Sequence, residues 1–345
     1  MEKGESVKTS DKDTSLKSDF SYPGYEEWKE AAISSLKGKD FTKSLLTHTY
    51  EGITLDPIYT EKDLEGLNID SLPGKVNFLR GQTKLGNLGT GWDICQRMGS
   101  GIPGEFNKEL SSALASGQNT IFISTDEATS AGIDPENSSE GKVGVNGLSL
   151  VINKDINDSL NNIDITEYPV VFDANVSGME LLMLLNAYMK SEGIDTDKIE
   201  GAINFDPLGV LSERGELDSQ PELYYKKMAL MTEWVKEKGV NMRIAGVSAL
   251  SYHNAGASAV QELAIALSTG VEYIDAMSRY GISPSEFAGR MSFRFGIGSD
   301  FFMEIAKLRA GRVLWNRILK EYSVPEDSRD FHVHAETSMF NQSGL

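Results

Sequence analysis

The 345-residue sequence is poor in the residues that cross-link chains or bind metals. Cys95 is its only cysteine, and it has four histidines. A single thiol cannot form a disulfide within the chain, and it cannot supply a thiolate cluster for zinc or iron–sulfur. His332 and His334 would share one face of a strand, but the sequence offers no third ligand beside them. We therefore expect no metal in this chain.

Basic residues and long apolar runs are also scarce. Lys and Arg number 33 against 51 Asp and Glu, so the formal net charge is −18. Nucleic acids and anionic membranes bind basic surfaces, so we expect neither as a partner, although a few local cations would suffice for a phosphorylated small ligand. The sequence has no apolar run of about 18 residues and no signal peptide at its start. We expect a cytoplasmic protein.

The chain is 40% apolar, which is enough for a full core, and its length accommodates an α/β barrel of about 250 residues. Residues 1–21 are almost wholly polar and are predicted to form a disordered leader. Residues 22–75 are predicted to form an N-terminal arm. It combines helical spacing at Tyr25–Leu36 with an extended stretch at Glu51–Thr60, where Pro57 disfavours a helix.

Strand and helix patterns alternate after the arm. The strand candidates are Thr90–Gln96, Thr120–Thr125, Leu148–Ile152, Pro169–Asn175, Glu200–Asp206, Asn241–Ser248, Met291–Gly296 and Phe331–Thr337. Strands that alternate with helices predict a parallel sheet, and eight of them predict closure into a (β/α)8 TIM barrel over residues 76–345. Two helical stripes are expected to face its core: Val260, Leu263, Ala264, Leu267, Val271 and Ile274, and Phe301, Ile305, Leu308, Trp315 and Leu319.

The stretch Ile244–Ser258 is the first candidate for a functional site. It begins as an apolar strand, becomes polar around Tyr252 and His253, and continues into a helix. Active sites of α/β barrels lie where the strands end, so His253 is the leading candidate, although a lone loop histidine more often has a structural role. The strand ends together form a polar mouth: Gln96, Arg97, Ser124–Glu127, Asp173, Asn175, Asn204, Asp206, Ser248–His253, Arg294 and His334–Thr337.

Several segments resemble the methylmalonyl-CoA mutase family, specifically its substrate-binding barrel. They run in the family's order from about residue 45 to 337. The matching segments are Glu51–Thr60, Phe78-Leu-Arg-Gly81, Trp92-Asp-Ile-Cys-Gln96, Gly141–Val145, Gly201–Asp206, Ser251-Tyr-His-Asn-Ala-Gly-Ala257 and Phe293–Trp315.

The resemblance implies the chemistry of that family, which interconverts methylmalonyl-CoA and succinyl-CoA with adenosylcobalamin as the radical source. It implies that His253 hydrogen-bonds the thioester carbonyl and that Arg214 holds the substrate carboxylate. A fixed donor polarises a carbonyl, and a guanidinium reads a carboxylate with two hydrogen bonds. The residues expected to contact the substrate are Trp92, Gln96, Arg97, Asn204 and Tyr252.

The sequence departs from the family's catalytic subunits at the first strand. Thr90-Gly91-Trp92 replaces Arg-Pro-Trp, and Arg97 replaces the tyrosine expected to press on the adenosyl group. Ser124–Thr129 is acidic where a polar, glutamine-rich loop is expected, and would repel an anionic CoA ester. The cobalamin-binding domain with its D-x-H-x-x-G signature is absent from the sequence.

These departures resemble the small, non-catalytic subunit of heterodimeric methylmalonyl-CoA mutases. Such a chain would be inactive alone, with His253 and Arg214 vestigial. It would support a large catalytic subunit through its barrel and N-terminal arm, while the partner binds adenosylcobalamin and acyl-CoA. The alternatives are a catalytic acyl-CoA mutase barrel whose cobalamin domain lies on a separate chain or a missing tail, and a stand-alone binding module.

Overall fold

The structure is a computed structural model that describes residues 23–67, 71–75 and 77–342. The predicted disordered leader at 1–21 lies outside the described residues. The chain divides into two compact units, Met1–Leu67 and Asn68–Leu345. No helix in the described part of the chain is both long and apolar enough to cross a membrane.

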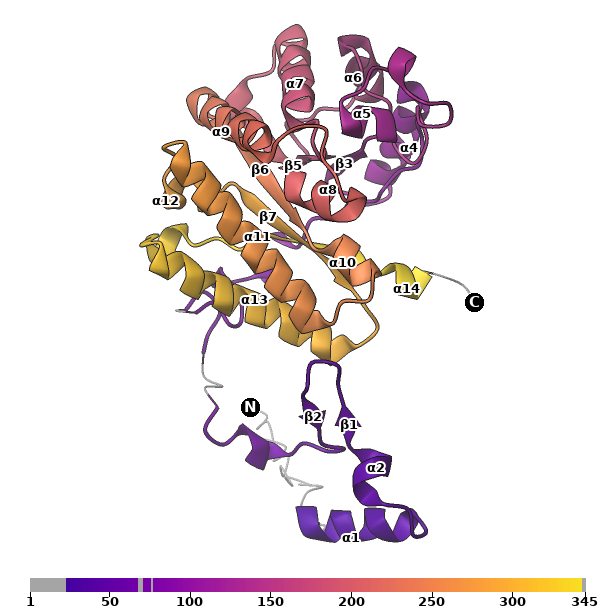
Figure 1. Cartoon of the computed structure of the whole chain (residues 1–345), viewed down its shortest axis with the longest axis vertical. Coiled ribbons are helices and arrows are strands. Elements are labelled where there is room, and N and C mark those ends of the chain that lie inside the picture. Colours follow the sequence, from indigo (N-terminus) through magenta and orange to yellow (C-terminus); the bar gives the residue numbers. More distant parts are fainter. Residues whose placement is uncertain (1–22, 68–70, 76, 343–345) are drawn as a thin grey trace, which may run out of the picture. The chain divides into compact units, whose positions relative to one another are not determined.

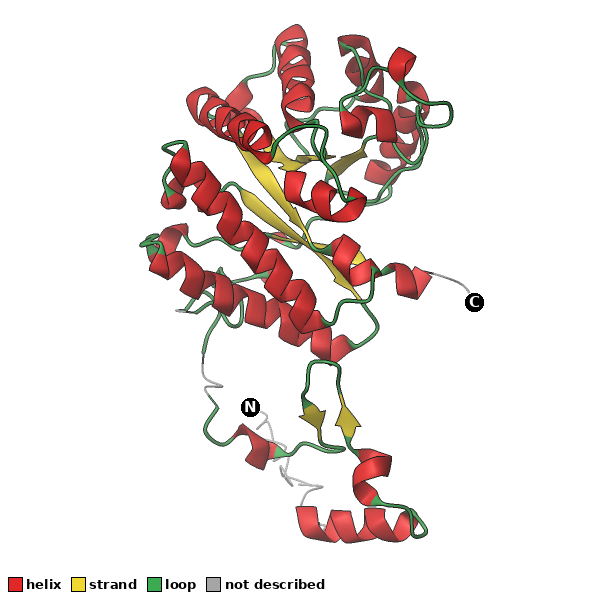
Figure 2. Cartoon of the chain, in the orientation of Figure 1, coloured by secondary structure: helices red, strands yellow, loops and turns green. Residues whose placement is uncertain are grey.

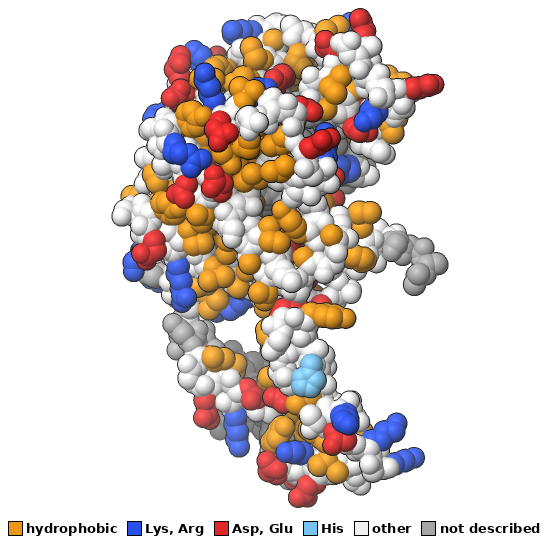
Figure 3. Space-filling model, viewed as in Figure 1, with side chains coloured by type: hydrophobic (Ala, Val, Ile, Leu, Met, Phe, Trp, Pro, Cys, Tyr) orange, Lys and Arg blue, Asp and Glu red, His pale blue; other side chains and the backbone are white. Residues whose placement is uncertain are grey.

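The first unit is a small helical and hairpin element whose described residues form no core of their own. Its elements are α1 (Tyr25–Ser35), α2 (Phe41–Leu45), β1 (Thr47–His48), β2 (Thr54–Leu55) and a 3-10 turn at Glu61–Leu64. The two strands pair antiparallel, and Asp40 caps α2 by accepting the Lys43 N–H at 2.8 Å. None of the unit's described residues is buried, and Figure 3 shows hydrophobic side chains open on its surface.

The second unit is built on six parallel strands in the order β3-β4-β5-β6-β7-β8 (Figure 1). The strands are β3 (Ile121–Ser124), β4 (Val170–Asp173), β5 (Glu200–Phe205), β6 (Asn241–Ser248), β7 (Met291–Ile297) and β8 (Val333–Thr337). The sequential order and parallel pairing confirm the predicted α/β architecture for these six strands.

Helices follow the strands and surround the sheet (Figure 2). They are α3 (Asn87–Thr90), α4 (Pro103–Ala115), α5 (Glu127–Ala131), α6 (Asn153–Ser159), α7 (Gly178–Glu192), α8 (Pro207–Arg214), α9 (Pro221–Lys238), α10 (Leu250–Asn254), α11 (Ala259–Arg279), α12 (Pro284–Ala288), α13 (Phe301–Glu321) and α14 (Met339–Gln342). Short 3-10 turns lie at Pro135–Asn137, Thr196–Lys198 and Glu326–Ser328.

Two of the eight predicted strands are wrong. Residues 91–100 have no regular structure, because side-chain amides take the place of a strand's backbone partners. The Ile94 N–H donates to Asn119 Oδ1 at 2.5 Å, and the Gln96 N–H donates to Gln118 Oε1 at 3.2 Å. In the second case, Leu148 makes a single bridge with Thr125. The described residues therefore form a six-stranded sheet rather than the eight expected.

The sheet is curled, so that side chains of its first and last strands meet. The ring of Phe122 on β3 lies 5.3 Å, centroid to centroid, from the ring of His334 on β8. The outer face packs apolar residues against the helices, and Trp315 of α13 meets Phe293 of β7 edge-on at 4.8 Å. A Cβ on Gly270 of α11 would lie 2.8 Å from the Trp315 ring, so this close helix packing requires glycine.

The predicted core stripes of α11 and α13 are only partly correct. The predicted residues that are exposed are Val260, Ala264, Phe301 and Ile305, and the buried faces include Glu262 and Lys307 instead. The predicted residues that are fully buried are Leu263, Leu267, Ile274, Trp315 and Leu319. The first two turns of both helices thus carry charged groups inward, beside the end of β7.

Candidate functional site

Four charged side chains close the inside of the curled sheet near the ends of its strands. Arg294 of β7 donates from Nη1 to Asp173 Oδ2 at 3.0 Å, and from Nε to Glu336 Oε2 at 3.0 Å. Its Nη2 also bonds Glu336. Arg97 reaches the same Asp173 oxygen at 3.1 Å and lies 3.8 Å from Glu336 Oε2. We call Arg97, Asp173, Arg294 and Glu336 the ion quartet.

The quartet shapes the electrostatics of the sheet interior. Burial raises the pKa of the Asp173 carboxyl, but the Arg294 and Arg97 guanidiniums outweigh it and hold that pKa below its usual value. Burial, together with the nearby Arg294 charge, lowers the pKa of His334 to about 4. Both guanidiniums also lie over the Phe122 ring, at 5.8 Å for Arg97 and 6.0 Å for Arg294. The interior thus holds a paired ionic cluster and a neutral histidine at pH 7.

A polar pocket of about 220 Å³ opens beside the quartet. Its lining comes from the irregular segment before α4, the ends of four strands and the helices that follow two of them: Arg97, Asp173, Asn175, Asp206, Gly209, Val210, Glu213, Ser248, Leu250, Ser251, Asn254 and Arg294. We call it the mouth pocket.

Asp206 lines the mouth pocket and connects the segments around it by hydrogen bonds. It accepts the Gly209 and Ser248 N–H groups at 3.0 and 2.8 Å and the Tyr273 hydroxyl at 2.5 Å. Burial nevertheless raises the pKa of this carboxyl to about 6. The carboxyl caps α8 and joins it to the end of β6, which is a structural role.

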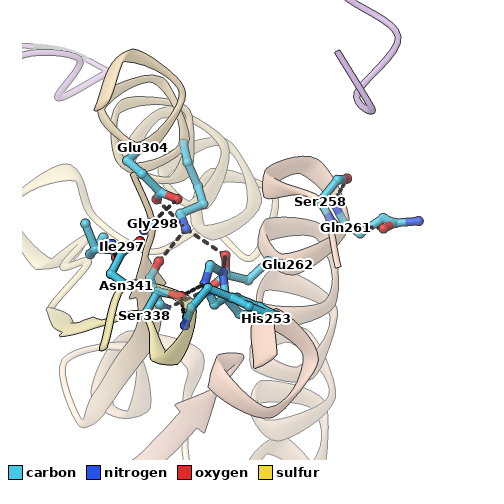
Figure 4. Close-up of polar contacts among 12 residues, drawn as sticks. His253, Ser258, Gln261, Glu262, Ile297, Gly298, Glu304, Ser338 and Asn341 are labelled. Atoms are coloured by element: carbon cyan, nitrogen blue, oxygen red, sulfur yellow. Dashed lines mark hydrogen bonds and ion pairs between the residues drawn. The ribbon is translucent and has the colours of Figure 1, made fainter. Parts of the chain in front are cut away.

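His253 lies on α10, directly after β6, and is bonded at both ring nitrogens (Figure 4). Its Nδ1 is 3.2 Å from Glu262 Oε2, and its Nε2 is 2.8 Å from the Ser338 hydroxyl. Only 11% of its side chain is exposed. A Cβ on Gly296 would lie 2.5 Å from the imidazole carbons, so the ring packs directly on the β7 backbone.

A buried charged cluster supports this histidine. Lys307 Nζ donates to Glu262 Oε2 at 2.6 Å and to the Gly296 carbonyl at 2.7 Å. It also lies 2.6 Å from Glu304 Oε2, an ion pair without hydrogen-bond geometry. Glu262 Oε1 accepts the Gly296 N–H at 2.9 Å. The cluster ties α11 and α13 to β7 and holds the carboxylate that orients His253.

Arg214 stands apart from the mouth pocket. It is exposed at the end of α8 and lines a separate groove of about 300 Å³ that also contains Glu127, Lys142 and Tyr224. The Lys142–Glu127 ion pair at 2.6 Å lies in the same groove. The two residues expected to be catalytic are therefore not brought into one pocket, and their roles stay predictions.

The predicted substrate-contacting residues are scattered. Trp92 is largely exposed, and Gln96 lines a groove against α4. Asn204 bonds the Ser292 hydroxyl at 2.6 Å inside the sheet, while Tyr252 is half-buried on α10 and does not line the mouth pocket. Of the five, Arg97 alone lines that pocket.

The sequence reasoning gave no role to Glu262 and Ser338, which contact His253, or to Lys307, which pairs with Glu262. Glu262 and Lys307 lie on helices that were interpreted only through their apolar core-facing residues. Ser338 lies directly after the last strand. The i, i+3 spacing of Glu304 and Lys307 on one helix was the available signal. Among the described residues, no three His, Cys, Asp or Glu side chains lie close enough together to hold a metal ion.

Comparison with known proteins matches most of the chain to one family. A family model described as Methylmalonyl-CoA mutase covers residues 48–344. The methylmalonyl-CoA mutase of Cereibacter sphaeroides is 33% identical over 316 residues, which are 91% of this chain and 44% of that protein. The Escherichia coli enzyme is 31% identical over 319 residues, 91% of this chain and 44% of that protein.

The mitochondrial methylmalonyl-CoA mutase of Homo sapiens is 31% identical over 319 residues, which are 92% of this chain and 42% of that protein. The chain spans less than half the length of these relatives, and the matched part includes the six-stranded sheet and its mouth. The chain therefore belongs to the methylmalonyl-CoA mutase family.

Proposed function

We propose that this chain is the non-catalytic small subunit of an adenosylcobalamin-dependent methylmalonyl-CoA mutase, supporting a longer catalytic subunit in an isomerase complex. The observation that carries the proposal is the state of His253. Both of its nitrogens have partners from this chain, so none is free to bond a substrate carbonyl.

The charge of the mouth supports the same proposal. The two arginines of the ion quartet are already paired with Asp173 and Glu336, and Glu213 adds a further carboxylate to the pocket lining. A CoA ester carries several negative charges, so it would approach acidic groups that no unpaired cation among the described lining residues offsets. The acyl-CoA substrate is proposed to bind to the partner subunit.

The three histidines of the second unit, His253, His332 and His334, do not fit an axial ligand for the cobalt of adenosylcobalamin. Such a ligand needs a neutral imidazole nitrogen open to the metal. His332 and His334 are largely buried at the sheet, and His253 is bonded at both nitrogens. His48 lies on the hairpin of the first unit, where its Nδ1 contacts Thr54 at 3.0 Å. The cofactor is therefore proposed to be held by the partner, and we derive no step through it.

The N-terminal arm is proposed to bind the partner subunit. Apolar side chains such as Tyr25, Ile33, Ile53 and Tyr59 are exposed on the first unit. A surface of this kind in a unit whose described residues form no core is typical of a segment that packs on another protein.

Affinity purification of the chain from its native extract tests the proposal. We expect a longer homologous mutase chain to co-purify at equal ratio, with mutase activity in the complex and none in this chain alone. Isothermal titration of methylmalonyl-CoA into the isolated chain should show no binding. Tight binding to the isolated chain, or co-purification of a small cobalamin-binding protein alone, would overturn the subunit assignment.

The alternative is a catalytic acyl-CoA mutase barrel whose cobalamin domain lies on another chain. The observation that favours it is the position of His253 directly after β6, where Glu262 orients the ring. The double substitution Arg97→Tyr with Thr90→Arg distinguishes the two functions. It should restore CoA-ester binding only if the mouth is otherwise intact, so restored binding supports the catalytic barrel and unchanged binding counts against it.

A further inference from the structure

The segment after β8 is attached to the end of β7 through Ser338. This serine is fully buried, and its N–H donates to the Ile297 carbonyl at 3.0 Å. Its hydroxyl meets His253 Nε2 at 2.8 Å, and the Phe340 ring lies 6.1 Å from the imidazole. Asn341 adds a bond from Nδ2 to the Ile297 carbonyl at 3.3 Å. Figure 4 shows Ser338 and Asn341 converging on this point beside His253.

Hydrogen-bond roles at this contact are fixed by the buried cluster. Glu262 receives the Lys307 ammonium and the Gly296 N–H, so its carboxylate serves as an acceptor and His253 Nδ1 carries the proton between them. With the proton on Nδ1, Nε2 is the acceptor at the other side of the ring, and the Ser338 hydroxyl donates to it. The Phe340 N–H donates to the same hydroxyl oxygen at 3.2 Å. Both ring nitrogens of His253 and the Ser338 hydroxyl therefore have hydrogen-bond partners.

The ring of His253 cannot turn away easily from this arrangement. Gly296 allows the imidazole to lie on the β7 backbone, where a Cβ would be 2.5 Å from its carbons. Glu262 holds Nδ1 from the opposite edge of the ring, and its side chain has no exposure. The direction of Nε2 is therefore set by the sheet and α11, and Ser338 meets an acceptor that is already in place.

We propose that His253 and Ser338 form a latch that holds the start of α14 against the end of β7. A ligand carbonyl and the Ser338 hydroxyl compete for the same nitrogen, so the imidazole becomes reachable only when the segment after β8 is released. This assigns His253 a conformational role that is independent of any mutase activity, and it holds for the isolated chain.

Carbethoxylation of the full chain by diethyl pyrocarbonate tests the latch. The reagent attacks an unprotonated imidazole nitrogen, and at His253 only Nε2 becomes available on opening. Peptide mass spectrometry follows its rate against exposed His48 as an internal reference. We expect His253 to react much more slowly than His48 in the unaltered chain. Ser338→Ala should accelerate it about five- to tenfold, the population shift expected from losing one hydrogen bond.

A second variant probes the latch from its other side. His253→Gln should raise the hydrogen-exchange rate of the Phe340 amide about five- to tenfold relative to amides of β7 in the same molecule. The matched control is Ser268→Ala on α11, which removes a hydroxyl bonded within its own helix at 2.8 Å. It should change neither readout. The latch is refuted if His253 reacts as fast as His48 in the unaltered chain, or if both latch variants behave like the control.

Discussion

Lys307 Nζ lies 2.6 Å from Glu262 Oε2, and neither side chain has more than 1% of its surface exposed. The pair joins α13 to α11 beneath His253, at the point where β7 ends. Removing one member of a buried ion pair leaves the other charge uncompensated, which costs more than the pair itself contributes. The support of the candidate site is therefore also a sensitive point in the stability of the fold.

Lys307→Met should lower the free energy of unfolding by about 3–5 kcal/mol, because Glu262 is left buried without its cation. Urea denaturation followed by circular dichroism measures the change. Lys320→Met on the exposed side of the same helix is the matched control and should change stability by about 0.5 kcal/mol or less. The double substitution Glu262→Leu with Lys307→Met should recover part of the loss. Equal losses of stability in Lys307→Met and Lys320→Met would contradict the assigned ion pair.

Alternation of strands and helices was enough to predict the six parallel strands, since period-2 and period-3.6 patterns separate well in buried sheets and amphipathic helices. Thr90–Gln96 failed because its partners are the side-chain amides of Gln118 and Asn119, which no periodicity records. Leu148–Ile152 failed for want of a paired neighbour beyond one bridge.

The candidate site was only partly predictable. Strand ends converge in any parallel sheet, so the meeting of Asp173 and Arg294 followed from their positions. Arg97 was expected there from a strand that does not form, and it reaches Asp173 from an irregular segment. Glu262 and Lys307 were missed because burial of a charge depends on its partner, and the partners lie 45 residues apart. Arg214 was assigned to the substrate carboxylate by resemblance alone. It lines a groove separate from the mouth pocket, and its role stays a prediction.

Gly296→Ala should displace the His253 ring, because the new methyl would lie 2.5 Å from the imidazole carbons. We expect a loss of roughly 1–3 kcal/mol in stability from the overpacking and a changed imidazole signal in the NMR spectrum. Gly298→Ala is the matched control two residues away. Its methyl would meet the end of the Glu304 side chain at 3.3 Å, which can move. A wild-type imidazole signal in Gly296→Ala would contradict the packing.

His334→Gln should make the free energy of unfolding depend less on pH between pH 6.5 and 4. Burial lowers the pKa of His334 to about 4, so the unfolded chain takes up a proton below about 6.5 and the folded chain does not until about 4. Stability is therefore lost as the pH falls through this window, by about 3 kcal/mol for this group. Urea midpoints measured across the window test the sign. A steeper acid loss in the variant would show that the assigned linkage is wrong.

Asp206→Asn should have the opposite effect on the pH dependence of the free energy of unfolding. Burial raises the pKa of this carboxyl to about 6, so the folded chain holds a proton that the unfolded chain has released above about 4. The group therefore lowers stability as the pH rises from about 4 to about 6. Without it, stability should rise more steeply with pH in that interval, whatever the absolute cost of the lost Gly209 and Ser248 bonds. An unchanged slope would contradict the shifted carboxyl.

The two arginines of the ion quartet should differ sharply in their contributions to the free energy of unfolding. Arg294→Met leaves Asp173 and Glu336 facing each other in the sheet interior, and the free energy of unfolding should fall by about 3–5 kcal/mol.

Arg97→Met removes a side chain that is 46% exposed and makes one hydrogen bond to Asp173, so we expect a loss of about 1 kcal/mol or less. Thermal and urea unfolding of both variants gives the comparison, and salt adds a second readout. Raising the salt concentration should narrow the gap between Arg97→Met and the unaltered chain, because exposed pairs are screened, and should leave the Arg294→Met deficit largely intact. Equal losses in the two variants would mean that Arg97 balances the carboxylates of the mouth as strongly as Arg294 does, which would contradict the expected difference.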